Sequence, residues 1–150
     1  MENQEASNKA LVKKIPKPNN IIRVTTTPDK DFFKWWCVLL RPFVSLTNKE
    51  IDVIASFLRQ RWELANKKNI TDPSLLDTLL MSEDIKKKVQ EECNITLQHF
   101  YVIMSNLKKT GVIVNNRIHP RLIPNVKLNK EGQVILMILF EEDKFKKDDL

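Results

Sequence analysis

Hydrophobic residues recur with the period of a helix from residue 47 onward. A first helix is expected after Thr47, because the sequence TNKE is a capping box in which Thr47 and Glu50 satisfy each other's backbone groups. Its apolar positions follow at intervals of three and four, at Ile51, Ile54, Leu58 and Trp62. These spacings place the four side chains on one face of the helix and predict that this face is buried.

Two more helices are predicted between residues 72 and 93. The first begins at Asp72-Pro73, because an acidic cap followed by proline at the first helical position is typical of a helix start. Its buried stripe is expected to consist of Leu75, Leu76, Leu79 and Leu80. Ser82 caps the second helix, in which Ile85 and Val89 face inward and the lysines at 86–88 lie on the solvent side.

The stretch NITLQHFYVIMSNLKKTGVI, residues 94–113, predicts a tight turn, a helix and a strand. Asn94 tolerates the left-handed conformation of the turn, Thr96 caps the helix and Gly111 ends it. The inward positions of this helix are Phe100, Ile103, Met104 and Leu107. A strand is expected to follow at Val112.

This spacing resembles that of winged helix-turn-helix domains of bacterial and phage regulators. In those domains a turn of the form Leu-Gly-Ile-Ser precedes the helix, and Leu-x-x-x-Gly-hydrophobic-Ile follows. This chain has CNIT at 93–96 and LKKTGVI at 107–113. The resemblance covers residues 47–140 and implies that the helix from Ser82 supports a recognition helix from Thr96.

The resemblance also implies a mainly α fold with a small β part, including a β-hairpin wing with strands at about 112–118 and 133–140. We expect three parts: an extended basic N-terminal arm at 1–31, a winged-helix-like domain at 32–140 and a charged C-terminal tail at 141–150. Within the arm, IIRVTTT at 21–27 has the composition to add to a sheet edge.

The expected recognition helix has unusual residues for a DNA reader. In DNA-binding members, the outward positions carry basic or polar side chains that bond to bases and phosphates. Here they are Leu97, Gln98, Tyr101, Val102 and Ser105. Only Gln98 offers a bidentate group for a base, so this face is predicted to bind protein.

Two other apolar segments allow more than one interpretation. The segment FFKWWCVLLRPFVSL at 32–46 is either a lid over the core or a partner-facing patch. In the second interpretation, the interface residues include Phe32, Phe33, Trp35 and Trp36. The run VILMILF at 134–140 is apolar at every position, which indicates burial on both faces, against FFKWW or another subunit.

Composition and charge leave nucleic acid open as a partner. The 150 residues carry a net charge of +6, and only two glycines are present, which excludes a glycine-rich phosphate loop. Duplex DNA remains a possible partner through the basic side chains Lys86, Lys87, Lys88, Lys108, Lys109, Arg117, Arg121, Lys127 and Lys130.

The residues offer no pattern for catalysis or for a cofactor. His99 and His119 are the only histidines, and neither has neighbours arranged as a triad or a metal site. Cys37 and Cys93 are isolated and are expected to be buried, reduced thiols. We therefore expect no enzyme activity, no cofactor, no metal and no small-molecule substrate.

The general character of the chain is similar to that of small basic proteins of crAss-like tailed phages. Some tailed-phage head-tail connectors are rings of small helical subunits with extended arms. This likeness implies a structural virion protein, with partners that are other protein subunits in a homo-oligomer and a hetero-assembly.

The alternative is a DNA-binding winged-helix regulator of phage or bacterial origin, located in the cytoplasm. The chain has no apolar run that could span a bilayer, and its start, MENQEASNKALVKK, lacks the apolar core of a signal peptide. For the structural protein we expect assembly in the host cytoplasm and a final location in the virion, and in both cases no membrane partner.

Overall fold

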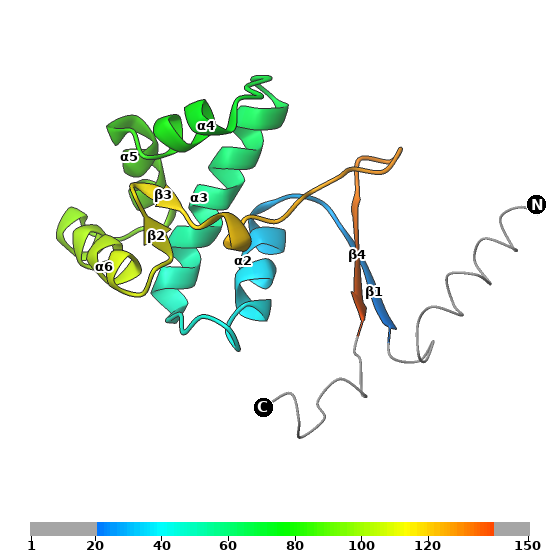
Figure 1. Cartoon of the computed structure of the whole chain (residues 1–150), viewed down its shortest axis with the longest axis horizontal. Coiled ribbons are helices and arrows are strands. Elements are labelled where there is room, and N and C mark those ends of the chain that lie inside the picture. Colours follow the sequence, from blue (N-terminus) through cyan, green and yellow to red (C-terminus); the bar gives the residue numbers. More distant parts are fainter. Residues whose placement is uncertain (1–20, 140–150) are drawn as a thin grey trace, which may run out of the picture. The chain divides into compact units, whose positions relative to one another are not determined.

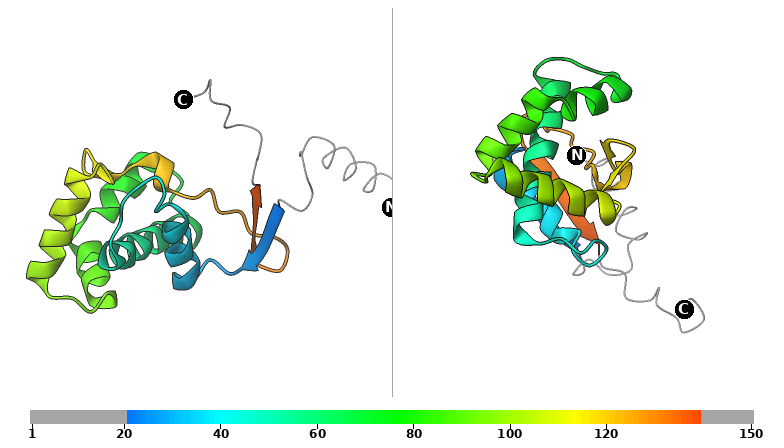
Figure 2. Two further views of the ribbon diagram at one scale, coloured as in Figure 1. Left: turned by 90° about the horizontal axis from the view of Figure 1, so that it is seen from below. Right: turned by 90° about the vertical axis from the view of Figure 1, so that its left-hand side faces the viewer.

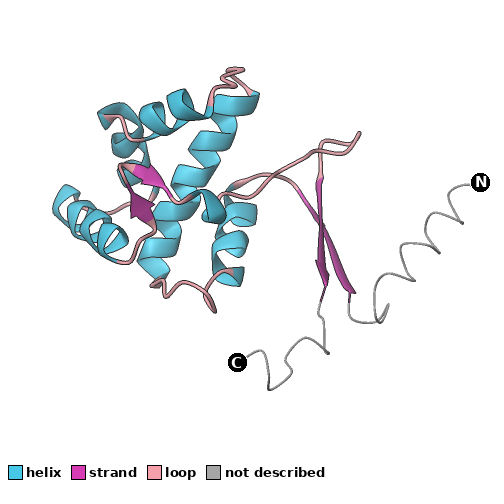
Figure 3. Ribbon diagram, viewed as in Figure 1, coloured by secondary structure: helices cyan, strands magenta, loops and turns pink. Residues whose placement is uncertain are grey.

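The computed structural model describes residues 21–139, which form five α-helices and two small antiparallel sheets of two strands each (Figures 1 and 3). The expectation of a mainly helical chain with a small β part is confirmed. The described residues fall into two compact units, a helical unit at 27–127 and a β-ribbon formed from 21–26 and 128–139. These limits differ from the expected single domain at 32–140.

Helix α3, Asn48–Asn66, is the centre of the helical unit (Figures 1 and 2). It packs against α2 (Lys30–Leu39), α4 (Pro73–Leu80), α5 (Glu83–Glu92) and α6 (Leu97–Lys109). The predicted capping box is present: the backbone N–H of Glu50 donates to the Thr47 hydroxyl, and that of Thr47 donates to the Glu50 carboxylate. Burial extends beyond the predicted face to Val53, Ala55, Ser56, Phe57, Gln60 and Leu64, because neighbours surround the helix.

A polar network joins α3 to α5. The carboxylate of Glu92 on α5 accepts from the hydroxyl of Ser56 at 2.5 Å and from the side-chain amide of Gln60 at 3.2 Å. Arg59 forms an ion pair with the same carboxylate and another with Glu63. Since Ser56 and Gln60 are both buried, Glu92 satisfies polar groups that would otherwise destabilise the core.

Helices α4 and α5 begin where predicted, at the caps Asp72 and Ser82. In α4 the predicted four-leucine stripe is only partly correct. Leu76 and Leu80 are buried, whereas Leu75 is 46% exposed. An eight-residue helix presents a narrow face to α3, so a leucine one position from the contact line stays in solvent.

The aromatic segment is a lid over the core. Phe32 and Phe33 on α2 are 2% and 1% exposed, so their assignment as interface residues was wrong. Trp36 is half-buried and its indole Nε1 donates to the carbonyl oxygen of Leu122 at 2.8 Å; Trp35 is also half-buried. The physical reason is that α2 packs against α3, which leaves these two phenylalanines in the core and out of reach of a partner.

The turn and helix at 94–111 form as predicted. Asn94 has a φ of 50°, and the Thr96 hydroxyl accepts from the backbone N–H of His99. At the end of α6, Gly111 has a φ of 82°, and the N–H of Val112 donates to the carbonyl of Leu107 at 3.0 Å. This pattern is a Schellman motif, which requires a left-handed residue and therefore favours glycine.

The predicted pairing of the wing strands is wrong. The segment at 112–118 is itself a hairpin, in which β2 (Ile113–Val114) pairs with β3 (Arg117–Ile118). Between them Asn115 and Asn116 have φ values of 53° and 57°. Two successive left-handed residues make the tight turn that suits a two-residue hairpin, so the chain reverses at once.

The apolar run pairs instead with the N-terminal segment. Strand β4 (Val134–Leu139) lies antiparallel to β1 (Ile21–Thr26), in a register that joins Ile21 to Leu139 and Thr26 to Val134. The β conformation expected for IIRVTTT is confirmed for Ile21–Thr26, which forms one strand of a two-stranded ribbon and does not add to a larger sheet. A single bridge between Leu128 and Val134 precedes the ribbon. The expected C-terminal tail and most of the N-terminal arm lie outside the described residues.

Candidate functional site

The outer face of α6 is the largest set of exposed apolar side chains on one described helix. Leu97, Tyr101 and Val102 are 51%, 55% and 53% exposed, and Gln98 and Ser105 are exposed between them. The opposite face is buried through Phe100, Ile103, Met104 and Leu107. Because the two faces share one helix with a cap at each end, burial of the inner face fixes the backbone positions of the outer residues.

A groove of about 330 Å³ runs between α6 and α5. The α6 side is apolar and consists of Leu97, Phe100 and Tyr101. The α5 wall is polar, with two carboxylates, two lysines and one amide, from Glu83, Asp84, Lys86, Lys87 and Gln90. The groove therefore has an apolar side on α6 and a polar side on α5.

Charge is distributed unevenly along α6. The exposed lysines Lys108 and Lys109 lie in its last turn, where positive charge interacts favourably with the helix dipole. Tyr101 and Lys108 are seven residues apart, so they share a face with Leu97. The outer face is therefore apolar at its start and basic at its end.

The candidate phosphate contacts are distributed over several segments. Lys87 and Lys88 are exposed on α5, Lys108 and Lys109 on α6, and Arg117, Arg121 and Lys127 in the chain that follows. Lys86 is the least available, because it is only 22% exposed and its Nζ lies 3.6 Å from Glu83. Lys130 belongs to the other compact unit. In the helical unit, exposed basic side chains therefore lie both before the β2–β3 hairpin, at Lys108 and Lys109, and in or after it, at Arg117 and Arg121.

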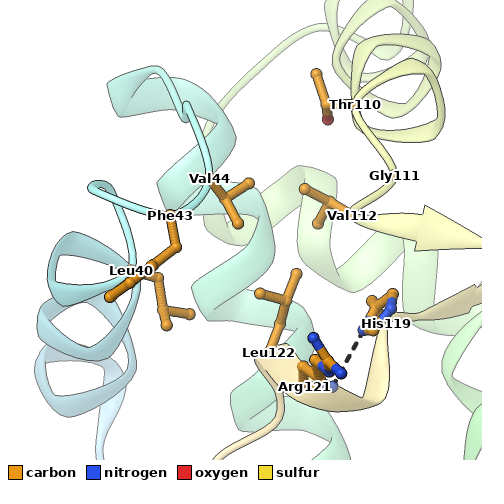
Figure 4. A pocket seen from close by; sticks show the side chains of 9 residues that line it. All are labelled: Leu40, Phe43, Val44, Thr110, Gly111, Val112, His119, Arg121 and Leu122. Atoms are coloured by element: carbon orange, nitrogen blue, oxygen red, sulfur yellow. Dashed lines mark hydrogen bonds between the residues drawn. The ribbon is translucent and has the colours of Figure 1, made fainter. Parts of the chain in front are cut away.

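A second hollow, of about 410 Å³, lies between the loop after α2 and the segments around the hairpin (Figure 4). Val44, Val112 and Leu122 point toward one another across it. On one side, the Nδ1 of His119 accepts from the backbone N–H of Arg121 at 3.2 Å. His119 therefore caps a 3₁₀ turn at Pro120–Leu122, which is a structural role.

Phe43 on the rim of this hollow was missed by the sequence-based expectations. It is 84% exposed, the highest value of any large hydrophobic side chain in the described residues. Its neighbour Pro42 is a signal that could have identified it, because proline ends helices and leaves the next residues in a loop.

The thiols and histidines do not form a reactive centre among the described residues. Burial raises the pKa of the Cys37 thiol to about 12, so it stays protonated, and Cys93 is buried as well. Across residues 21–139 no group of three His, Cys, Asp or Glu side chains is placed to hold a metal ion. None of the helices in this range is long and apolar enough to cross a membrane.

Comparison of the chain with models of protein families, with curated proteins and with solved structures found no match.

Proposed function

We propose that this chain is a non-enzymatic interaction protein, a subunit of a multi-chain assembly, and that the outer face of α6 binds a neighbouring protein. The observation that carries the proposal is the half-exposure of Leu97, Tyr101 and Val102 on one capped helix. Complete burial of such a side chain contributes roughly 1.5–3 kcal/mol, and about half of each remains available to a partner.

The side chains around these three residues favour protein over nucleic acid. A helix that reads DNA presents donors and cations along the length that enters the groove. On α6 that length holds Leu97, Tyr101 and Val102, and the lysines come only in the last turn. A protein partner can desolvate these apolar groups, whereas a phosphate backbone cannot.

The assembly that we propose is a tailed-phage particle, in a head-tail connector or tail ring. The support for this is the general likeness of the sequence to small basic phage proteins, together with the apolar face on α6. The helical unit offers this face to a neighbouring subunit.

A DNA-binding regulator is the second candidate. The turn at Asn94 and the capped start of α6 have the form of a helix-turn-helix. Lys108, Lys109 and Arg117 are exposed and could contact phosphates. On this proposal duplex binding weakens steeply as salt increases, because counterions are released on binding.

Two measurements test the proposal. Sedimentation velocity gives the native mass of the protein, and a titration with duplex DNA at low and high salt gives its affinity for DNA. The variant Tyr101→Ala with Val102→Ala is expected to lose assembly while circular dichroism still reports a folded protein. Leu75→Ala is the matched control, because Leu75 is 46% exposed but lies on α4. Salt-sensitive DNA binding by a monomer or dimer, or an assembly that the double variant leaves intact, overturns the proposal.

A further inference from the structure

The hollow of Figure 4 is lined mainly by apolar side chains and shares no lining residue with the groove between α6 and α5. Its volume of about 410 Å³ lies in the range of sites that hold organic groups, roughly 300–1,000 Å³. Val44, Val112 and Leu122 point toward one another across it and form an apolar floor. The floor therefore suits an aliphatic or aromatic group.

The charge of this lining has a single sign. Arg121 is its charged residue, and no carboxylate lines the hollow, whereas the groove on α6 combines two carboxylates with two lysines. Arg121 is exposed, and none of the hydrogen bonds or ion pairs within residues 21–139 involves its guanidinium group. A guanidinium group beside an apolar floor is complementary to a carboxylate attached to an apolar group.

His119 adds a second donor to the lining. Its Nδ1 accepts from the backbone N–H of Arg121, so the neutral ring carries its proton on Nε2. Thr110 also lines the hollow, but its hydroxyl donates to the carbonyl oxygen of Asn106 at 3.1 Å. The side chains of the lining that remain available are donors, which again match a carboxylate.

We infer that this hollow binds a segment of a partner protein that carries an apolar side chain next to a carboxylate. The apolar side chain lies on the floor formed by Val44, Val112 and Leu122, and the carboxylate accepts from Arg121. This second binding site goes beyond the proposed function, because it uses no residue of the outer face of α6.

Phe43 favours a protein segment over a small free acid. This side chain lies on the rim and is 84% exposed. A molecule held inside the hollow would leave the ring in water, whereas a segment that crosses the rim covers it. Burial of an aromatic side chain is favourable, and such side chains are common anchors of protein interfaces.

The apolar floor also disfavours a nucleic-acid backbone. A phosphate group could accept from Arg121, but it cannot bury the side chains of Val44 and Leu122. Binding of a polyanion would therefore depend on charge alone, and binding of an acidic and apolar segment depends on both parts of the site. This difference is what the test measures.

The probes are acetylated tripeptide amides, titrated into the isotope-labelled full chain and followed by NMR. Glu-Phe-Glu carries both features, Gln-Phe-Gln lacks the carboxylates, and Glu-Ser-Glu lacks the apolar side chain. Glu-Phe-Glu is expected to bind roughly five- to tenfold more tightly than either of the others. It is expected to shift the backbone amide resonances of Thr110, Gly111 and Val112, which lie at the hollow.

Three variants remove the parts of the site separately. Arg121→Glu is expected to weaken binding of Glu-Phe-Glu roughly tenfold, because it opposes the carboxylates, and to change binding of Gln-Phe-Gln little. Phe43→Ala is expected to weaken both peptides that contain phenylalanine. Val44→Phe fills the floor and is expected to abolish their binding, with circular dichroism as the check that this variant folds.

Arg117→Glu is the matched control for Arg121→Glu. Arg117 is exposed on β3 and does not line the hollow, and its substitution changes the net charge by the same amount. This variant is expected to bind Glu-Phe-Glu as the wild type does. Equal losses in the two arginine variants would mean that net charge, and not the hollow, determines binding.

Other outcomes overturn the inference in different ways. If no peptide shifts the resonances at the hollow at millimolar concentration, the site does not exist. If Glu-Ser-Glu binds as well as Glu-Phe-Glu, or duplex DNA displaces the peptide, Arg121 serves a polyanion. If phenylpropionate binds as tightly as Glu-Phe-Glu and Phe43→Ala has no effect, the ligand is a small free acid.

The inference and the proposed function can fail independently. Tyr101→Ala with Val102→Ala alters the outer face of α6, which does not line the hollow, and is expected to leave peptide binding unchanged. Arg121→Glu is likewise expected to leave the assembly through α6 intact. Loss of peptide binding in the α6 variant would contradict a separate site.

Discussion

The hydroxyl of Ser56 donates to the carboxylate of Glu92 at 2.5 Å, a bond between residues 36 positions apart that joins the central helix to the helix behind the groove. Gln60 and Arg59 bond to the same carboxylate. The position of α5, and therefore of the polar wall of the groove, depends on this contact.

Glu92→Ala is expected to destabilise the fold by about 2–3 kcal/mol, because it leaves buried donors on α3 without an acceptor. Urea unfolding followed by circular dichroism measures the change. The neighbouring Glu91 is exposed, and Glu91→Ala is the control, with an expected change within about 0.5 kcal/mol. Equal effects of the two variants would show that the network does not hold α5.

Phe33 and Phe43 give opposite expectations for the same substitution. Phe33 is 1% exposed and Phe43 is 84% exposed. Phe33→Ala is expected to cost about 3–5 kcal/mol through the cavity that it leaves. Phe43→Ala is expected to change stability by less than about 0.5 kcal/mol. Thermal unfolding of the two variants measures the difference. If Phe33 belonged to a partner-facing patch, Phe33→Ala would leave the stability of the isolated protein nearly unchanged.

Substitutions in the hairpin turn at Asn115 and Asn116 are expected to change stability according to how well the new residue adopts a left-handed backbone conformation. Asn116→Gly should be neutral or slightly stabilising, since Asn-Gly is the favoured sequence for this turn. Asn116→Ala should cost about 1 kcal/mol, because its φ of 57° is a left-handed conformation that the polar asparagine side chain supports by local hydrogen bonding and alanine does not. The pair differs only in one methyl group. A larger loss for glycine than for alanine in chemical unfolding would contradict the assigned turn.

Cys37 is expected to resist thiol reagents in the native protein. Its pKa is raised to about 12 by burial, whereas the ordinary value is 9.0. Because the pKa of Cys37 is higher in the folded than in the unfolded chain, burial of the protonated thiol contributes fully to stability below pH 9. That contribution is lost as the pH rises from 9 toward 12. Reaction with a thiol reagent at neutral pH should be slow until denaturant is added. The loss of stability at alkaline pH should be smaller in Cys37→Ala.

The features that could be predicted from the sequence depend on residues only a few positions apart in the chain. The caps at Thr47, Asp72, Ser82 and Thr96 were all located from the sequence, because a cap bonds to a backbone group within three residues. Gly111 was also identified from local spacing. The exposure of Leu97, Tyr101 and Val102 followed from helical periodicity once the inner face was recognised.

Contacts between distant segments were not predictable in the same way. The apolar run at 134–139 could have paired with any strand of suitable length, and its partner is β1, more than a hundred residues earlier. Asn115 and Asn116 are the local signal for the hairpin, since asparagine tolerates the left-handed region that such a turn needs, and this signal contradicts a wing strand running through 112–118.

The sequence by itself therefore determined the helices from α3 to α6, the caps at their starts, the turn before α6 and the residues on its outer face, since each depends on atoms a few positions apart. Only the tertiary structure decided which apolar residues are covered: Phe32 and Phe33 are buried, Leu75 is not, and Phe43 is exposed. Coverage depends on which elements meet, and that is set by the packing of the whole chain around α3, not by any one segment.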